Sequence, residues 1–284
     1  MSGPGAVACC VTLLAVSFES SAAQAVINGF DPPSVRTAGL GGASVAILGD
    51  AAAIFANPTG IATIRSAAFE GSYEHRANGA LVRSGAAAVR IGRFDWGLGA
   101  ERVDLEPAPA DVLGLGTLVV RYGVLAAGAS GKYVERNAAG PPVHAWASDA
   151  GVAIALFDIA ALAASVVNLT GDFSDGTHLR RITRAGLTMN YVDPQGTWRL
   201  LTTLEGRWPE DARATLAAGA EAGIVTKSVG FVARFGAAGG APSVAGSPLT
   251  LGAGLALGPV RFDYAYQSVD QGHARHQFGL RWSN

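Results

Sequence analysis

Residues that could carry out covalent chemistry are sparse in this sequence. The chain of 284 residues has 2 Cys and 5 His, and both cysteines, Cys9 and Cys10, lie near its start. His273 and His276 have the spacing of a pair of metal ligands, but they stand in a polar segment without a Cys nearby, so a solvated loop is the simpler interpretation. No Ser, His and Asp form a pattern that suggests a catalytic triad. We therefore expect no enzyme activity, no metal and no cofactor.

The composition is poor in charge. Hydrophobic residues make up 49% of the chain and charged residues 15%, whereas about 25% charged is typical of soluble domains. With 38 Gly, such a chain is either an Ala- and Gly-rich soluble protein or a membrane barrel whose apolar residues face lipid. The net charge of −1 and the lack of a basic run argue against nucleic acid as a partner.

Residues 1–25 have the features of a secretory signal peptide. An apolar stretch covers residues 6–18, and Ala23-Gln24-Ala25 supplies small residues for a cleavage site, although the segment before the stretch lacks the usual Lys or Arg. A lipoprotein site at Cys9 is the alternative, with a short apolar segment before it. Cleavage after residue 25 would leave a chain without Cys, which excludes disulfides and thiol chemistry.

From residue 66 onward the sequence alternates between apolar and polar residues. In segment 260–267, four apolar side chains occupy one set of alternate positions, and the other set includes Arg261, Asp263 and Gln267. Segments 197–208 and 276–282 repeat this pattern. Because successive side chains of a strand point to opposite faces, each segment would have one apolar face and one charged face.

A soluble sandwich and a membrane barrel share this alternation. Three features favour the barrel: the segments are long enough to span a bilayer, which takes about 9–11 residues, the leader exports the chain, and aromatic residues gather near segment ends, as in interfacial girdles. We therefore predict an all-β fold, an antiparallel transmembrane β-barrel. The aromatic residues are Phe94, Trp96, Tyr122, Tyr133, Trp146, Tyr191, Trp198, Trp208 and Trp282.

The predicted barrel has about fourteen strands, an even number as in bacterial single-chain barrels. Tight turns such as Gly92-Arg93 alternate with longer polar loops such as 170–180. The apolar run 149–169 is long enough for a transmembrane helix, but Asp158 interrupts it, and two strands joined at Phe157-Asp158 are the better interpretation. The predicted strands are 67–73, 81–91, 94–103, 115–122, 125–134, 146–156, 159–168, 182–191, 198–207, 215–225, 229–235, 250–257, 260–267 and 276–282.

The charged faces of these strands would line the lumen. Charges of both signs can pair across neighbouring strands and hold water, and their near balance gives no prediction about ion selectivity. The sequence does not resolve which acid pairs with which base. The acids are Asp95, Glu101, Asp149, Glu205, Glu221 and Asp263. The bases are Arg121, Lys132, Arg184, Arg199, Arg207, Arg234, Arg261 and Arg281.

The segment 26–65, ahead of the strands, has a different character. Asp50 can cap a short helix over residues 51–56, and Pro58 then ends that helix. Gly39, Gly41 and Gly42 allow close packing or positive φ. These features predict a compact strand–helix–turn unit without chemistry of its own.

This segment also carries a recognisable motif. It consists of Arg-x-x-Gly-Leu-Gly-Gly-Ala-x-Val-Ala, then Asp-Ala, then Asn-Pro-x-Gly-Ile-Ala; the matching residues are Arg36, Gly39, Gly41, Gly42, Asp50, Asn57, Pro58 and Gly60. The motif resembles the opening of the FadL-like superfamily, especially its PorV/PorQ branch, and segment 250–280 is similar to the C-terminal strands of that branch. The resemblance implies a fourteen-stranded barrel over residues 66–284, with segment 26–65 as a plug in its lumen.

The chain departs from the family in two ways. It is short for a FadL transporter, and it ends in Trp282-Ser283-Asn284 rather than in a terminal aromatic residue, so the usual barrel-assembly signal is incomplete.

The resemblance leads to one main hypothesis and two alternatives. As a PorV/PorQ-like protein, the chain would be a barrel of the cell outer membrane that serves type IX secretion as an accessory or shuttle, with secretion-system proteins as partners, or a structural barrel. As a FadL-like channel it would pass a small hydrophobic molecule, with residues 34–62 as the gate. The third possibility is a soluble periplasmic or secreted β-protein. Both barrel hypotheses make outer-membrane lipid the main partner and exclude nucleic acid.

Overall fold

The computed structural model describes residues 34–76, 78–104, 106–137, 141–157, 159–193, 196–226, 229–239, 246–269 and 274–284. The expected signal peptide at 1–25, the expected turn residue Asp158 and the expected loop residue His273 lie outside these ranges.

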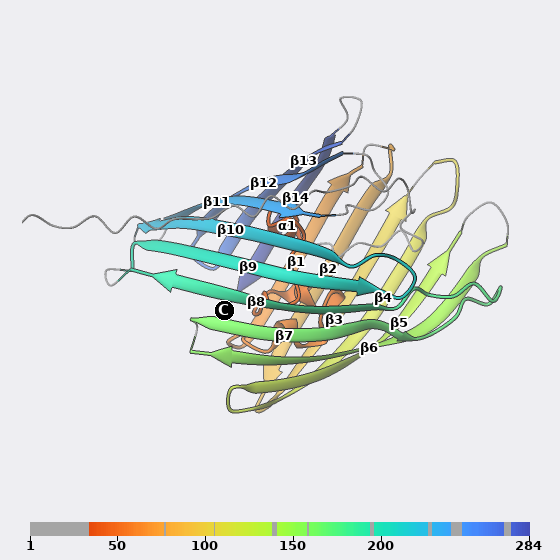
Figure 1. The fold of residues 1–284 in the computed structure, drawn as a ribbon, viewed down its shortest axis with the longest axis horizontal. Helices are drawn as coiled ribbons and strands as arrows, with labels where there is room; N and C mark the ends of the chain where they lie inside the picture. Colours follow the sequence, from red (N-terminus) through yellow and green to blue (C-terminus); the bar gives the residue numbers. More distant parts are fainter. Residues whose placement is uncertain are drawn as a thin grey trace, which may run out of the picture.

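The described residues form a closed antiparallel β-barrel of fourteen strands, which confirms the predicted fold (Figure 1). Each strand pairs with its neighbours in sequence, and β1 closes the ring by pairing with β14. The strands are β1 (Ala67–His75), β2 (Leu81–Ile91), β3 (Phe94–Asp104), β4 (Asp111–Tyr122), β5 (Leu125–Arg136), β6 (Val143–Leu156), β7 (Ala160–Thr170), β8 (Ile182–Val192), β9 (Trp198–Pro209), β10 (Thr215–Thr226), β11 (Val229–Ala238), β12 (Gly246–Leu257), β13 (Val260–Val269) and β14 (Ala274–Ser283). Closure leaves no unpaired strand edge, the condition under which strands can cross a hydrocarbon layer.

Side chains alternate between the outer surface and the lumen. In β13, Phe262 is 48% exposed, whereas its neighbour Asp263 is 5% exposed, so the apolar side chain points outward and the charged one inward. Trp146 and Trp198, near strand ends, are also exposed on the outside, as in the aromatic girdles of membrane barrels. An apolar surface of this extent does not suit a soluble β-protein.

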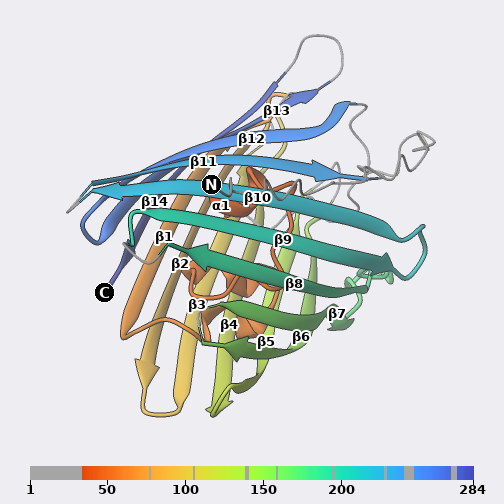
Figure 2. The same cartoon turned by 60° about the vertical axis from the view of Figure 1, so that its left-hand side comes forward.

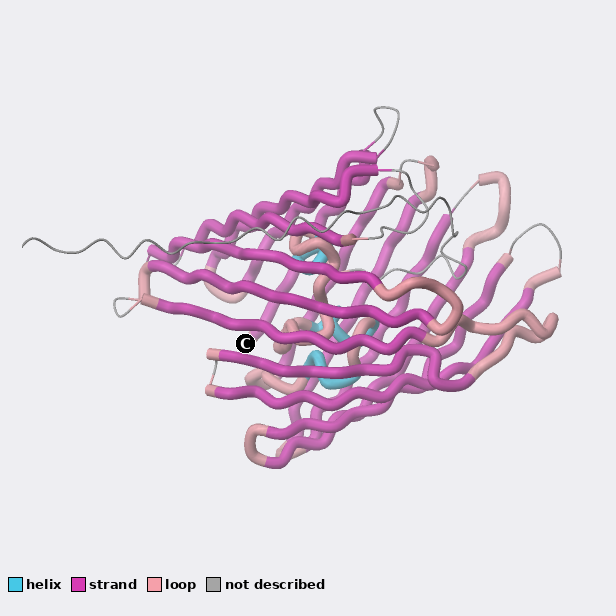
Figure 3. Tube along the Cα trace, viewed as in Figure 1, coloured by secondary structure: helices cyan, strands magenta, loops and turns pink. Residues whose placement is uncertain are grey.

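The two ends of the barrel differ in their connections. At one end the hairpins are tight, and Gly92 and Gly258 turn the chain with φ of 62° and 58°. At the other end the connections are longer, for example residues 171–181 between β7 and β8 (Figures 2 and 3). We call these the turn end and the loop end; in outer-membrane barrels short turns face the periplasm and long loops face outward.

The apolar run 149–169 belongs to β6 and β7, so the helical alternative for this run is wrong. No helix in the described ranges is long and apolar enough to cross a membrane.

Residues 34–64 fold into the lumen, and we call them the plug. The plug contains α1 (Val35–Ala38) and two 3-10 helices, η1 (Ala51–Phe55) and η2 (Pro58–Ile61), joined by turns. The strand expected in this unit is absent from residues 34–64, so that expectation was wrong. Gly41 and Gly42 adopt φ of 71° and 76°, which turns the chain where an extended segment was expected.

The local signals of the plug were partly misjudged. The helix expected after Asp50 is present as η1, but the Asp50 side chain does not cap it, because the carboxylate binds Arg36 and Arg281 instead. Asn57 is the cap of η2 and accepts hydrogen bonds from the backbone N–H and the hydroxyl of Thr59. Pro58 therefore begins a helix as well as ending one, as its fixed φ allows.

Candidate functional site

The plug meets two unlike sides of the lumen. α1 packs against β12, β13 and β14, whereas η1 and η2 pack against β1 to β6. The lumen face of β8 to β14 carries buried charges, and that of β2 to β7 carries mainly apolar side chains. We call the first face the ionic wall and the second the apolar wall.

Arg36 anchors α1 to the ionic wall. Its Nε donates to Glu221 Oε2 and its Nη2 to Glu221 Oε1, both at 2.9 Å. Its Nη1 donates to Asp50 Oδ2, also at 2.9 Å. All three side chains are buried. A bidentate arginine–carboxylate pair fixes orientation as well as distance, so this contact sets where α1 lies.

These groups belong to a closed ring of alternating charges. Arg281 Nη1 donates to Asp50 Oδ1 and its Nε to Asp263 Oδ2, both at 2.6 Å. Arg234 Nη1 lies 2.7 Å from Asp263 Oδ1, and its Nε donates to Glu221 Oε2 at 2.7 Å. We call this set the ion ring; in order it is Arg36, Asp50, Arg281, Asp263, Arg234 and Glu221. Because loss of one partner would leave other buried charges unpaired, the ring holds the plug to β10, β11, β13 and β14.

Asp50 is the acid that the plug contributes to the ring. Burial opposes its ionisation, but the nearby charges of Arg281 and then Arg36 outweigh burial and hold its pKa well below the usual range. Asp50 is therefore ionised at neutral pH, with one arginine on each carboxylate oxygen.

A second anchor joins the plug to β9. Glu205 Oε2 accepts the backbone N–H groups of Ser44 and Val45 at 2.5 and 2.7 Å. Arg207 Nε donates to Glu205 Oε1 at 2.6 Å, and its Nη2 donates to the carbonyl of Gly42 at 2.5 Å. These two side chains satisfy backbone groups of a plug segment that has no regular secondary structure, as buried backbone requires.

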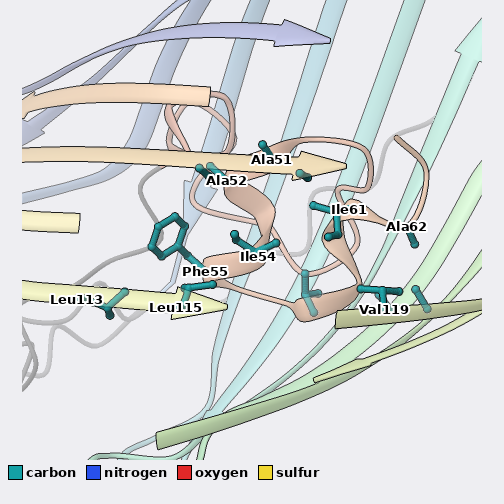
Figure 4. Close-up of a cluster of buried hydrophobic side chains, with 14 of the residues drawn as sticks. Ala51, Ala52, Ile54, Phe55, Ile61, Ala62, Leu113, Leu115 and Val119 are labelled. Carbon is teal, nitrogen blue, oxygen red and sulfur yellow. The ribbon is translucent and has the colours of Figure 1, made fainter. Parts of the chain in front are cut away.

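The plug binds the apolar wall by packing of side chains. Ile54 and Ile61 are fully buried and belong to one cluster with residues of the wall (Figure 4). The cluster also includes Phe173 and Leu179 from the connection between β7 and β8, so apolar contact extends from the loop end to the plug. The wall residues of the cluster are Ala86, Ala88, Leu113, Leu115, Val119, Ala126, Val134, Ala145, Ala147, Ala153 and Ala163.

Glycines on the lumen face of the strands make room for the plug. A Cβ at Gly151 of β6 would overlap the amide oxygen of Asn57, so the plug approaches the backbone of this strand directly. The same kind of close approach occurs on both walls. The other strand glycines that lie against plug atoms are Gly97, Gly99, Gly128, Gly186, Gly219, Gly236, Gly252 and Gly279.

Five charged groups on the apolar wall pair mainly with one another. Lys132 and Asp149 lie 2.7 Å apart, and Asp95 pairs with Arg90 and Arg121 at 2.9 and 2.7 Å. Within the described ranges, Arg90 alone of these five reaches the plug, where its Nη2 donates to the carbonyl of Ala62 at 2.7 Å. This wall therefore holds the plug with far fewer charges than the ionic wall does.

The structure shows the hydrogen-bond and ion-pair partners of the motif residues and lumen charges, which the sequence could not assign. Of the motif residues, Arg36 and Asp50 enter the ion ring, and Asn57 also donates from Nδ2 to the carbonyl of Val45 at 2.8 Å. Gly60 packs against Ala53 within the plug. The lumen charges singled out in the sequence lie buried or half-buried on the inner face; they are Arg121, Lys132, Arg199, Glu205, Arg207, Arg261, Asp263 and Arg281.

The partners of Glu205 and Glu221 could not be identified from the sequence because these partners come from distant segments of the chain. The backbone N–H groups that bind Glu205 have no signal in the sequence, and Glu221 was named without its partners Arg36, Arg199 and Arg234.

The described ranges contain no group of three or more His, Cys, Asp or Glu placed to hold a metal ion. His276 lies in β14, where its Nδ1 is 2.8 Å from the hydroxyl of Tyr264. The absence of catalysis stays a prediction.

The closed barrel, its apolar outer surface and its plugged lumen define an outer-membrane β-barrel protein. No protein-family model and no curated protein matches the sequence. The fold, by contrast, matches solved structures. It is similar to that of CymD, a monoaromatic hydrocarbon channel, with a TM-score of 0.61 and 13% identity over 91% of this chain and 98% of that one.

Two further neighbours are similar. The toluene transporter TodX of P. putida has a TM-score of 0.57 and 11% identity over 91% of this chain and 99% of that one. A FadL homologue of Pseudomonas aeruginosa has a TM-score of 0.53 and 12% identity over 88% and 98% of the two chains. At identities of 11–13%, these neighbours show that the chain shares their barrel fold. None of the three is described as a PorV/PorQ protein, so that assignment and a role in type IX secretion stay predictions, as does export by a signal peptide.

Proposed function

We propose that this protein is an outer-membrane channel for small hydrophobic molecules and that the plug closes it. The apolar wall carries the proposal. Its cluster of buried side chains extends from Phe173 and Leu179 at the loop end to Ile54 and Ile64 of the plug. An apolar molecule that replaces these contacts exchanges one apolar neighbour for another, which leaves no buried charge unpaired.

The neighbours support the same function. CymD and TodX are described as monoaromatic hydrocarbon channels. This chain shares their fold, and its plug packs against apolar side chains on one side of the lumen. The hypothesis of a FadL-like channel is therefore better supported than the secretion hypothesis. No structural feature of the described residues supports a role in secretion.

The described conformation corresponds to the closed channel in this proposal. Ile54, Ile61 and Leu40 of the plug are fully buried between the walls. Passage of a molecule then requires η1 and η2 to leave the apolar wall while the ion ring keeps α1 in place.

The test is uptake of radiolabelled toluene by cells that carry the protein in their outer membrane, compared with cells that carry the empty vector. Intact cells are used because the polar sugar surface of the outer membrane, rather than a bare lipid bilayer, slows an apolar solute. We expect several-fold faster uptake with the protein. Equal uptake in the two strains, with the barrel present in the outer-membrane fraction, overturns the proposal.

A matched pair of variants locates the route. Leu113 is 7% exposed on the apolar wall. Leu113→Gln places a polar amide on this wall without a hydrogen-bond partner. This variant should lower toluene uptake toward the level of cells with the empty vector. Leu113→Met keeps an apolar side chain of similar volume and should retain uptake. If both variants transport like the unchanged protein, the route does not follow this wall.

A further inference from the structure

Two arginines point away from the lumen, on the outer surface of neighbouring strands. The side chains of Arg83 in β2 and Arg102 in β3 are 58% and 57% exposed. Both stand in the set of alternate positions that faces outward, whereas the other Arg and Lys residues of the described strands belong to the inward set. Charged side chains on the lipid face of a barrel are unfavourable, so this pair requires a compensating partner.

The arginines lie at the loop end of the apolar outer surface. Along β3 the outward side chains before Arg102 are Phe94, Trp96, Leu98 and Ala100. At a rise of about 3.4 Å per residue, about 27 Å of strand separates Phe94 from Arg102, and a tilt of about 40° reduces this to about 21 Å of height. Because the apolar band of a membrane barrel is about 25 Å tall, Arg102 stands at its boundary, where lipid headgroups begin.

A single carboxylate serves both arginines. Arg83 and Arg102 are direct partners across β2 and β3, an unfavourable arrangement for like charges. Oδ1 of Asp104 accepts a hydrogen bond from Nε of Arg102 at 2.9 Å, but Nη2 of Arg83 lies 3.8 Å from Oδ2. Arg83 therefore has no hydrogen bond within the described ranges, and its guanidinium donors are available on the outer surface.

Two further acids, Glu135 and Glu106, do not neutralise this pair. Glu135 is two strands away, in β5, and its carboxylate accepts hydrogen bonds from the hydroxyl of Tyr133 and the amide of Asn137. Glu106 is exposed in the connection to β4, and in the described part of the chain no ion pair joins it to either arginine. The two guanidinium groups thus share only the carboxylate of Asp104.

The outer surface beside the arginines, toward the turn end, consists of small residues. One outward position nearer the turn end, Gly85 and Ala100 are direct partners across β2 and β3, and Gly114 of β4 is opposite Ala100. A Cβ at Gly85 or Gly114 would meet no atom within 4 Å. Tyr73 of β1, which is 45% exposed, borders this surface beside Arg83. A hydrocarbon chain therefore has room to lie against the strands directly below the arginine pair.

We propose that Arg83 and Arg102 bind a phosphate of lipid A, the phosphorylated glycolipid of the outer leaflet. Arginine presents its donors in a planar fork that matches a phosphate, and the bound anion compensates the repulsion between the two guanidinium groups. The acyl chains of the lipid then extend along Gly85 and Ala100 into the apolar band. This binding rests on the outer-membrane location that belongs to the proposed function, with the loop end facing outward, but it does not depend on transport.

The test is native mass spectrometry of the purified barrel in a nonionic detergent, with lipid A added in a concentration series. Two further probes are lipid A from which the phosphates have been removed and inorganic phosphate alone. We expect lipid A to bind at least tenfold more tightly than either probe. Equal binding of the dephosphorylated lipid would show contact with acyl chains only, equal binding of phosphate would show an unspecific anion site, and either result overturns the proposal. Loss of toluene uptake with lipid A binding intact would contradict only the channel.

Three variants locate the site. The double variant of Arg83→Gln and Arg102→Gln should weaken lipid A binding at least tenfold. Its control is the double variant of Arg181→Gln and Arg213→Gln, which removes the same charge from exposed connections at the loop end and should bind lipid A unchanged. Asp104→Asn should tighten binding several-fold, because Arg102 then has no carboxylate as a competing partner. Unchanged binding in the first double variant, or no gain in D104N, overturns the proposal.

If the double variant of Arg83 and Arg102 does not assemble, the salt dependence of the unchanged protein replaces it. At about 1 M salt the Debye length falls to about 3 Å, so lipid A binding through exposed arginines should weaken several-fold relative to about 0.1 M salt. Binding that does not change with salt overturns the proposal.

Discussion

The ionic wall and the apolar wall hold the same plug by different physics. On the ionic wall, Arg36 and Asp50 are bound through oriented, charge-assisted hydrogen bonds. On the apolar wall, Ile54 and Ile61 are bound by close packing. Breaking a buried ion pair leaves a charge without compensation, at a cost of about 3–5 kcal/mol. Apolar contacts, by contrast, are non-directional, and another apolar group can replace them.

The difference assigns separate tasks to the two sides of the lumen. The ionic wall fixes the position of the plug, and in the proposed channel the apolar wall is the side on which a hydrophobic molecule would take the place of plug contacts. Changes on the ionic wall should therefore have the larger effect on the stability of the plugged barrel. The predictions below test this order.

The largest effect is expected for Glu221→Gln. Glu221 is fully buried and binds Arg36, Arg199 and Arg234, so the variant leaves three arginines short of a counter-charge. We expect a loss of about 3–5 kcal/mol in the free energy of unfolding, measured by urea titration in detergent, and faster protease cleavage within the plug. Glu210→Gln is the control, because Glu210 is an exposed residue paired with Arg181; its loss should stay below about 1 kcal/mol. Equal stability of the two variants would show that the ion ring does not hold the plug.

On the apolar wall, Ile54→Ala should cost about 2–5 kcal/mol, and Ile54→Val about 0.5–1.5 kcal/mol. The side chain of Ile54 is fully buried between η1 and the strands, so each carbon removed leaves a gap. Urea titration of both variants measures the loss in the free energy of unfolding, which should be larger for Ile54→Ala than for Ile54→Val. A loss that is absent in both variants would mean that packing on this wall does not stabilise the plug.

A smaller effect is expected for Gly151→Ala. The added methyl group would overlap the amide oxygen of Asn57, and overpacking of this kind costs about 1–3 kcal/mol. Gly131→Ala is the matched control, since a Cβ at Gly131 meets no atom within 4 Å, and its stability should be close to that of the unchanged protein. Equal urea midpoints for the two variants would contradict the close approach of plug and strand.

The smallest effect concerns pH. The pKa of Asp50 is lowered in the folded protein, so its contribution to stability is complete above the ordinary carboxyl pKa of about 3.9 and declines as pH falls below that value. The stability difference between the unchanged protein and Asp50→Asn should therefore be constant from pH 8 to pH 5 and shrink below about pH 4. The difference for Ile54→Ala should not change over this range. A difference for Asp50→Asn that already shrinks between pH 7 and pH 5 would contradict a lowered pKa.

The barrel could be predicted from the sequence because its signal is local. Alternation with period 2 shows which residues of a strand share a face, as with Phe262 outside and Asp263 inside, and tight turns separate one strand from the next. The plug was expected from a resemblance of motif residues, and its internal structure was predicted less well. Asp50 has the type and position of a helix cap, but two arginines from α1 and β14 bind its carboxylate instead.

The pairing of charges could not be predicted for a physical reason. Arg36 and Glu221 are 185 residues apart in sequence, and which acid faces which base depends on the position of α1 across the barrel. The charged faces of the strands were visible in the pattern of the sequence, but the closed ring arises only in three dimensions. The same holds for Gly151, which reads as an ordinary strand glycine until Asn57 is placed against it.

The ion ring also has a consequence for the order of assembly. Asp50 precedes the first strand and Arg281 stands in the last, 231 residues later, so their contact cannot form before the final strand is synthesised. A barrel that closed without its plug would enclose Glu221, Arg234 and Asp263 without the charges of Arg36 and Asp50. Closure with the plug inside is therefore favoured over closure without it, because only the plugged barrel gives these buried charges their partners.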